Sequence, residues 1–189
     1  MLFRSLTGWD FSSLYNTDLV DLNTRRGLTI WDVHNSNFAN NVGNGLASGI
    51  HSGGTCINNT ITGNNFSGNG SGLSTDTYVN DSNWTVTNNN FSNSSSWAMA
   101  YQGAPAEISG NDFTGSAHGL LLNSASNFTL NAKTNIWDLA DAATALNIGN
   151  SNTLTIDSLI VFGGGGTAVQ TTNSHNITIN ALATCYKDA

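Results

Sequence analysis

Short apolar pairs recur along the chain, and four mostly polar residues separate the two members of each pair. The clearest copies are residues 32–38, 60–66, 85–91 and 107–113, each of which ends in phenylalanine. Looser copies start at Leu130, Leu154 and Ile177, and the seven copies are on average 24 residues apart. A strand of a few residues cannot bury its apolar face alone, so the pattern predicts about seven coils stacked on one another.

Stacking in register places equivalent residues in columns. Asparagine tolerates the left-handed backbone angles of a tight bend, and side-chain amides can hydrogen-bond from one coil to the next. The bends hold Ser36, Asn64, Asn89 and Asn111, which indicates an asparagine ladder. The two predicted inward columns are Val33, Ile61, Val86, Ile108, Leu130, Leu154 and Ile177, and then Phe38, Phe66, Phe91, Phe113, Leu159 and Leu182.

The coils of about 24 residues, with asparagine at the tight bend, resemble the right-handed parallel β-helices of the pectin-lyase-like superfamily. Phage tailspikes and related virion proteins contain such helices. The resemblance covers about residues 28–182 and implies an all-β fold, a right-handed parallel β-helix (solenoid) of about seven coils. It implies little about function, because this fold hosts many. Lys133 and Asn135 stand where Asn and Phe are expected, which predicts a change of shape there.

Residues 1–27 do not fit the repeat, whereas residues 28–189 form the β-helix with a short C-terminal cap. Open ends of a solenoid expose strand edges and core, so they need caps or partners. The N-terminal segment is rich in apolar groups, among them Phe3, Trp9, Phe11 and Tyr15. Two interpretations remain open, a cap on the first coil and a docking arm that binds another protein.

Composition and charge narrow the function. The chain has 29 Asn and 20 Gly, residues that disfavour helix interiors. Its net charge is −7, with five basic residues against twelve acidic ones. No basic patch or polybasic anchor is present, and no apolar run approaches the roughly 20 residues of a membrane span. We therefore expect neither nucleic acid nor a membrane as a partner.

The chemistry-bearing residues are scattered. Polysaccharide lyases of the resembled superfamily use a basic residue with acidic calcium ligands, but only Lys133 lies well inside the coils, next to Asp157 in a predicted surface pair. His118 matches one dipeptide of the polygalacturonases without the accompanying motifs. Cys56 and Cys185 are predicted to lie several coils apart, which is too far for a disulfide. We expect no catalytic residue, metal site or cofactor.

Two outward features suggest binding. Threonines flank several of the inward apolar residues, as in Thr60 and Thr62, and a regular Thr ladder is typical of ice-binding solenoids. Ordinary strand propensity and a packing face between subunits explain the pattern as well. Aromatic and acidic residues near loops suit sugar rings or protein interfaces, and the candidate contact residues are Trp137, Asp138, Asp141, Tyr78 and Tyr101.

The sequence therefore predicts a non-enzymatic structural or binding β-helix protein of a phage or similar virion, located in the virion or outside cells. It would be a capsid decoration or a head or tail fibre component, a homotrimer that contacts other virion proteins through residues 1–27. The alternative is a module that cleaves or binds polysaccharide, and a less favoured one is an ice-binding protein.

Overall fold

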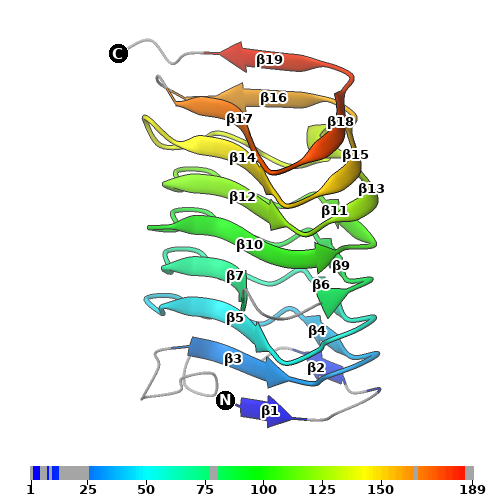
Figure 1. Cartoon of the computed structure of the whole chain (residues 1–189). Helices are drawn as coiled ribbons and strands as arrows, with labels where there is room; N and C mark the ends of the chain where they lie inside the picture. Colours follow the sequence, from blue (N-terminus) through cyan, green and yellow to red (C-terminus); the bar gives the residue numbers. More distant parts are fainter. Residues whose placement is uncertain are drawn as a thin grey trace.

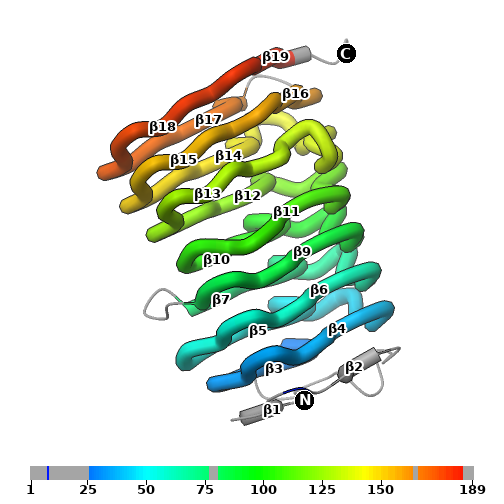
Figure 2. Tube along the Cα trace, turned by 90° about the vertical axis from the view of Figure 1, so that its right-hand side faces the viewer, coloured from blue at the N-terminus to red at the C-terminus, as the bar shows by residue number. Residues whose placement is uncertain are grey.

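The computed structural model describes residues 2–4, 8, 10–12, 26–76, 81–163 and 166–185 of the 189-residue chain. These residues wind into a stack of coils whose strands pair in parallel (Figures 1 and 2). In Figure 1 the front strands run from left to right as the chain rises from the N-terminus to the C-terminus, and the chain returns behind them, so the coils are right-handed. The predicted all-β parallel β-helix of about seven coils is confirmed.

The front sheet takes one strand from each coil, and three smaller sheets cover the other sides. The front sheet contains β1 (Leu2–Arg4), β3 (Arg26–Trp31), β5 (Ser48–Gly53), β7 (Ser71–Thr75), β10 (Trp97–Ala104), β12 (His118–Asn123), β14 (Thr144–Gly149) and β17 (Thr167–Thr172), with β8 (Asp81–Ser82) paired to β10. The back sheet of the N-terminal coils contains β2 (Asp10–Ser12), β4 (Asn37–Ala39), β6 (Thr60–Thr62), β9 (Thr85–Thr87) and β11 (Glu107–Ser109).

The last coils have a different cross-section. A three-stranded sheet of longer strands follows the front sheet there, and a two-stranded sheet lies behind. Their members are β13 (Ser126–Leu130), β15 (Asn152–Ile156) and β18 (His175–Ile179), and then β16 (Leu159–Phe162) and β19 (Leu182–Cys185). The change begins with β13, and a 3-10 turn, η1 (Ala132–Thr134), follows it directly. The change of shape predicted around Lys133 is confirmed.

Five buried asparagines connect the coils at one bend. They are spaced 23, 25, 22 and 24 residues apart. In each step the asparagine of the lower coil donates its backbone N–H and its amide N–H to the Oδ1 atom of the asparagine in the coil above, with N···O distances of 2.8–3.1 Å. Because the bend is buried, these groups would otherwise have no partner. The asparagine ladder is confirmed, with Asn41 in place of the predicted Ser36, and it consists of Asn41, Asn64, Asn89, Asn111 and Asn135.

The residue directly before each of the first four ladder asparagines is left-handed. Asn40, Gly63, Asn88 and Gly110 have φ angles of 54°, 64°, 57° and 66°. Glycine adopts this region without strain, and asparagine tolerates it better than other residues with a side chain. The local sequence thus alternates between the two residue types that permit the bend.

In three places the structure stacks residues differently from the predicted inward columns. Ile61 stacks on Phe38 and not on Val33, whose N–H instead contacts the Sγ atom of Cys56 at 3.4 Å. Leu154 stacks on Phe128, whereas Leu130 lies opposite Ile156. The phenylalanine column continues from Phe113 to Trp137, with ring centroids 5.0 Å apart, and not to Leu159. The apolar residues recur within each coil as well as between coils, so the pattern fits more than one register.

The described parts of the N-terminal segment extend the stack downwards. Strand β1 pairs in parallel with β3, and β2 pairs with β4, with Phe11 opposite Phe38. Of the four residues expected in a docking arm, Phe3 and Phe11 lie in these strands, while Trp9 and Tyr15 lie outside the described residues. The boundary at residue 27 and the docking role remain predictions.

The ladder predicts a large effect of Asn89→Ala. This change leaves the backbone N–H of Asn64 and the carbonyl of Ile61 without their partner inside the core. We expect the free energy of unfolding to fall by about 2–4 kcal/mol in urea denaturation. The control is Asn58→Gly, which removes exposed ladder bonds to Asn35 and Asn83 at a left-handed position and should cost less than about 1 kcal/mol. Equal losses in the two variants would contradict the role of the buried ladder.

Candidate functional site

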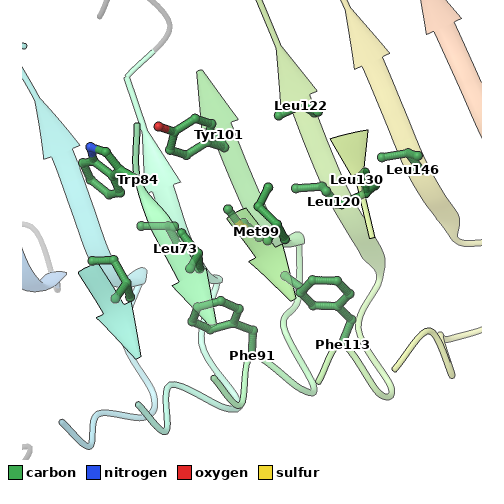
Figure 3. Packing of buried hydrophobic residues seen from close by; sticks show 14 of the residues in the cluster. Leu73, Trp84, Phe91, Met99, Tyr101, Phe113, Leu120, Leu122, Leu130 and Leu146 are labelled. Carbon is green, nitrogen blue, oxygen red and sulfur yellow. The ribbon is translucent and has the colours of Figure 1, made fainter. Parts of the chain in front are cut away.

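A buried polar cluster lies inside the third and fourth coils, where β8 meets β10. Asp81 accepts a hydrogen bond of 2.5 Å from the Ser52 hydroxyl and one of 2.9 Å from the backbone N–H of Cys56. Tyr101 lies close by and is 1% exposed. Its ring packs edge-to-face against Trp84, with the two ring centroids 5.6 Å apart (Figure 3). The Tyr101 hydroxyl has no hydrogen-bond partner among the described residues.

Burial determines the chemistry of this cluster. Desolvation is the main reason that the pKa of Asp81 rises to about 7 and that of the Cys56 thiol to about 12. It likewise raises the pKa of Tyr101. A protonated thiol is a poor nucleophile and a poor metal ligand. Cys56 is a buried free thiol, as expected, and the cluster has the character of a core element without access for substrate.

The other ionisable residues form isolated contacts. Lys133 Nζ lies 3.0 Å from Asp157 Oδ2 with both side chains partly exposed, which confirms the predicted surface pair. His51 contacts Ser74 and Asp76 at 3.0 and 3.5 Å, and burial is the main cause of its lowered pKa. Within the described part of the chain, no three His, Cys, Asp or Glu residues lie close enough to hold a metal ion.

His118 lies on the outer side of the front sheet. Its ring packs on Trp97 with centroids 4.7 Å apart, and its Nδ1 accepts the backbone N–H of Thr144 at 3.1 Å. Since its ring stacks on an aromatic and one ring nitrogen is already bonded, its contacts are those of a structural residue.

The described candidate contact residues divide into buried aromatics and more accessible carboxylates. Trp137 is 2% exposed and Tyr101 1% exposed, so the expectation that both lie near the surface in loops is wrong. Trp137 donates from Nε1 to the Ala132 carbonyl at 2.8 Å and fills the column above Phe113. Tyr78 lies outside the described residues. Asp138 is half-buried and Asp141 exposed, so of the described candidates these two are accessible to a ligand from outside.

Sequence reasoning missed an exposed apolar patch beside Trp137, formed by Ile136, Ile160 and Phe162 and called the outer patch below. These side chains are 52%, 43% and 45% exposed. Together with Lys133 they line one shallow hollow on the outside of the coils. The four consecutive apolar residues Leu159–Phe162 could have revealed it, because alternation along a strand forces two of them outwards.

The outer patch interrupts an otherwise polar face. Below Ile136 in the same register lie three polar residues, Asp112, Asn90 and Asn65. Large exposed apolar side chains that cluster on such a face mark a binding surface more often than chance exposure does.

The threonine ladder is broken into two faces. Thr60 and Thr62 lie opposite Thr85 and Thr87 in the back sheet, with the hydroxyls of Thr62 and Thr87 3.1 Å apart. The later threonines, such as Thr155, belong to the separate sheet of β13, β15 and β18. The partial threonine ladder is therefore divided between two sheets, and neither part is an extended regular array.

The parallel sheets and the stacked coils define this chain as a parallel β-helix protein. A family model described as "Periplasmic copper-binding protein (NosD)" matches residues 12–136, about two thirds of the chain. The chain therefore belongs to the NosD family. Neither the curated proteins nor the solved structures that were compared gave a match. Within the described residues, no helix has the length and apolar content to cross a membrane.

The buried Asp81 predicts a pH-dependent stability. Its pKa is higher in the folded chain, about 7, than in an unfolded one, so stability is greatest in acid and falls as the pH rises from about 4 to about 7. Asp81→Asn keeps an acceptor for the Cys56 N–H and stays neutral. We expect it to raise the free energy of unfolding above pH 7 by up to about 4 kcal/mol and to flatten the pH profile. A Ser116→Ala control, far from Asp81, should leave the shape of the profile unchanged. Parallel profiles for the wild type and Asp81→Asn would refute a neutral Asp81.

The inward position of Trp137 predicts a contrast between neighbours. Trp137→Ala should cost about 3–5 kcal/mol in urea denaturation, because it empties a large core volume. Ile136→Ala, at the exposed position beside it, should change stability by no more than about 0.5 kcal/mol. If the two costs were reversed, the orientation of this segment would be wrong.

Proposed function

We propose that this chain is a non-enzymatic β-helix protein that acts as a rigid binding scaffold outside the cytoplasm. The observation that supports it best is the outer patch, three exposed apolar side chains on a face that is otherwise polar. The asparagine ladder below the patch fixes the coils that carry it. A surface of this kind binds another macromolecule and needs no reactive group.

The distribution of ionisable groups favours binding over catalysis. Glycosidases need two carboxyl groups close together across a substrate site, and lyases need a base beside the sugar. Lys133, the one basic residue between positions 27 and 186, is held by Asp157 at the surface. The polysaccharide alternative also loses Tyr101 and Trp137, the aromatic rings that would stack on a sugar, because both are buried. Of its predicted contact residues that the structure describes, it keeps Asp138 and Asp141, and Tyr78 lies outside the described residues.

The family description raises the question of copper. Copper in proteins is bound by imidazole, thiolate and thioether groups. In the described chain His51 is engaged by Ser74 and Asp76, His118 by Thr144 and Trp97, and Cys56 is a buried protonated thiol. These residues do not come together as a ligand set. The described residues therefore do not fit a copper site, and the proposed function does not involve one.

The family description does support a location outside the cytoplasm, since it names a periplasmic protein. In its finer form the proposal keeps the setting predicted from the sequence, a structural component of a phage or similar virion. The low charge content and the uncharged threonine faces support it, because such faces suit burial against other subunits. The homotrimer and the contact of residues 1–27 with other virion proteins are part of this finer proposal.

Two assays on the purified full chain test the proposed function. Equilibrium dialysis against Cu(I) and Cu(II), followed by metal analysis, should retain far less than one copper per chain. Incubation with acidic and neutral polysaccharides should release neither reducing nor unsaturated sugar ends. One tightly bound copper per chain, lost on His51→Ala but kept on Thr60→Ala, would contradict the scaffold proposal, and so would any sugar release.

A further inference from the structure

The C-terminal end of the rod leaves part of the hydrophobic core uncovered. Strands β17, β18 and β19 form the last described coil, and each is the final strand of its sheet (Figures 1 and 2). Ile179 and Leu182 lie opposite Ile156 and Leu159 of the coil below, so they face the core. They are 37% and 48% exposed, whereas Ile156 and Leu159 are 1% and 0% exposed. These two core positions therefore lack the cover that a following coil provides lower in the stack.

The same three strands have backbone edges that no described strand covers. They pair in parallel with β14, β15 and β16 of the coil below, and with no other strand of the described chain. Soluble proteins usually protect such edges with lysine or other charges, proline or a bulge. Residues 167–185 contain no Asp, Glu, Lys, Arg or Pro. The edges are therefore uncharged, which favours pairing with further strands.

Two asparagine amides indicate which groups a following strand would carry. In the exposed ladders of the last coils, the upper asparagine donates its amide N–H to the Oδ1 atom of the asparagine below. Asn173 donates to Asn150 at 3.4 Å, and Asn176 donates to Asn152 at 3.1 Å. Asn150 donates in the same way to Asn123. The Oδ1 atoms of Asn173 and Asn176 therefore occupy the positions that accept an N–H from the next coil.

The spacing of the pairings shows that a single strand would not be enough. Thr144 lies opposite Thr167, Asn152 opposite His175, and Leu159 opposite Leu182, so all three sheets have the same offset of 23 residues. One extended strand could cover only one of the three edges. A parallel coil with this spacing covers all three edges and the core between them.

A second copy of this chain does not match this end. The N-terminal strand β2 belongs to the five-stranded back sheet, whereas the last coils have separate sheets of three and two strands. Head-to-tail copies would therefore bring two different cross-sections together. Two C-terminal ends that met about a two-fold axis would place their strands antiparallel, unlike the parallel pairing of the described sheets.

We propose that the C-terminal end of the rod, formed by β17, β18 and β19, binds a parallel β-coil of another protein, which continues the stack. The partner coil carries apolar side chains above Ile179 and Leu182 and an N–H donor for the Oδ1 atom of Asn173. Its main-chain hydrogen bonds give affinity, and the core positions select its side chains.

The proposal rests on the proposed scaffold function and deepens it by naming the class of partner at one end of the rod. It agrees with a homotrimer, because subunits packed side by side leave their ends free. The two proposals can fail separately, since the copper and polysaccharide assays do not involve this end.

The first test joins one extra coil to the full chain. A copy of residues 144–166 placed directly after Ala189 starts 23 positions beyond Thr167 and so keeps the period. We expect amide hydrogen exchange in residues 167–185 to slow by at least about tenfold relative to the chain without the extension. An extension of scrambled sequence is the matched control and should leave the exchange unchanged. Unchanged exchange with the copied coil, or equal slowing by both extensions, would overturn the proposal.

The second test presents the coil as a separate molecule. A fluorescein-labelled synthetic peptide with the sequence of residues 144–166 is mixed with the full chain up to about 1 mM, the effective concentration that a short tether gives. Fluorescence anisotropy should show saturable binding, weakened by at least about tenfold in Ile179→Asp, which puts a charge at the covered core. Thr178→Asp, on the outward side of the same strand, is the control and should leave the dissociation constant unchanged. Circular dichroism verifies that each variant is folded.

The mass of the chain without peptide tests for a different occupant of this end. We expect native mass spectrometry to give the same oligomeric state for the wild type and for Ile179→Asp. An assembly that Ile179→Asp breaks apart would place a second copy at this end and would refute the proposal. The absence of saturable peptide binding, or equal weakening by Ile179→Asp and Thr178→Asp, would refute it as well.

Discussion

The fold depends on the hydrogen bonds made by buried asparagine amides at one bend. A parallel solenoid must turn several times per coil, and at each turn the backbone loses its strand partners. At this bend one side chain replaces them: the Oδ1 of Asn89, for example, serves two donors of Asn64, while its own amide reaches the carbonyl of Ile61. A left-handed residue precedes each of the first four ladder asparagines, and an aromatic residue follows each of the last four by two positions.

The same arrangement explains which parts of the fold the sequence predicts. The coil length recurs in seven copies and the asparagine bend in several of them, so the solenoid and its approximate period can be predicted from the sequence. The register cannot, because apolar residues lie at several positions of each coil. Val33 and Phe38 fit the same pattern as Ile61 and Phe66, yet the structure pairs Phe38 with Ile61. Core packing and strand pairing choose between registers that a one-dimensional pattern leaves equal.

The same difference between predicted and observed register explains why the candidate contact residues were placed incorrectly. Asn135 is the fifth asparagine of the ladder, and two residues after Asn64 and Asn111 stand Phe66 and Phe113. Counted in the same way, Trp137 occupies the inward aromatic position and Ile136 faces out. The η1 turn disguises this, because Ala132 and Lys133 replace a regular strand. The exposed patch therefore arises from residues that read as core in the sequence, and the aromatic that reads as a contact residue is core.

The amide oxygens of the ladder all point the same way, since the Oδ1 atoms of Asn64, Asn89, Asn111 and Asn135 each accept from the asparagine one coil nearer the N-terminus. The amides of Asn64, Asn89 and Asn111 use their second N–H in the other direction, towards a backbone carbonyl of the coil below. Aligned amide dipoles add, and in a medium of low dielectric they polarise one another. Between Asn41 and Asn135 the bend therefore has an electrical direction that is independent of the charged side chains on the surface.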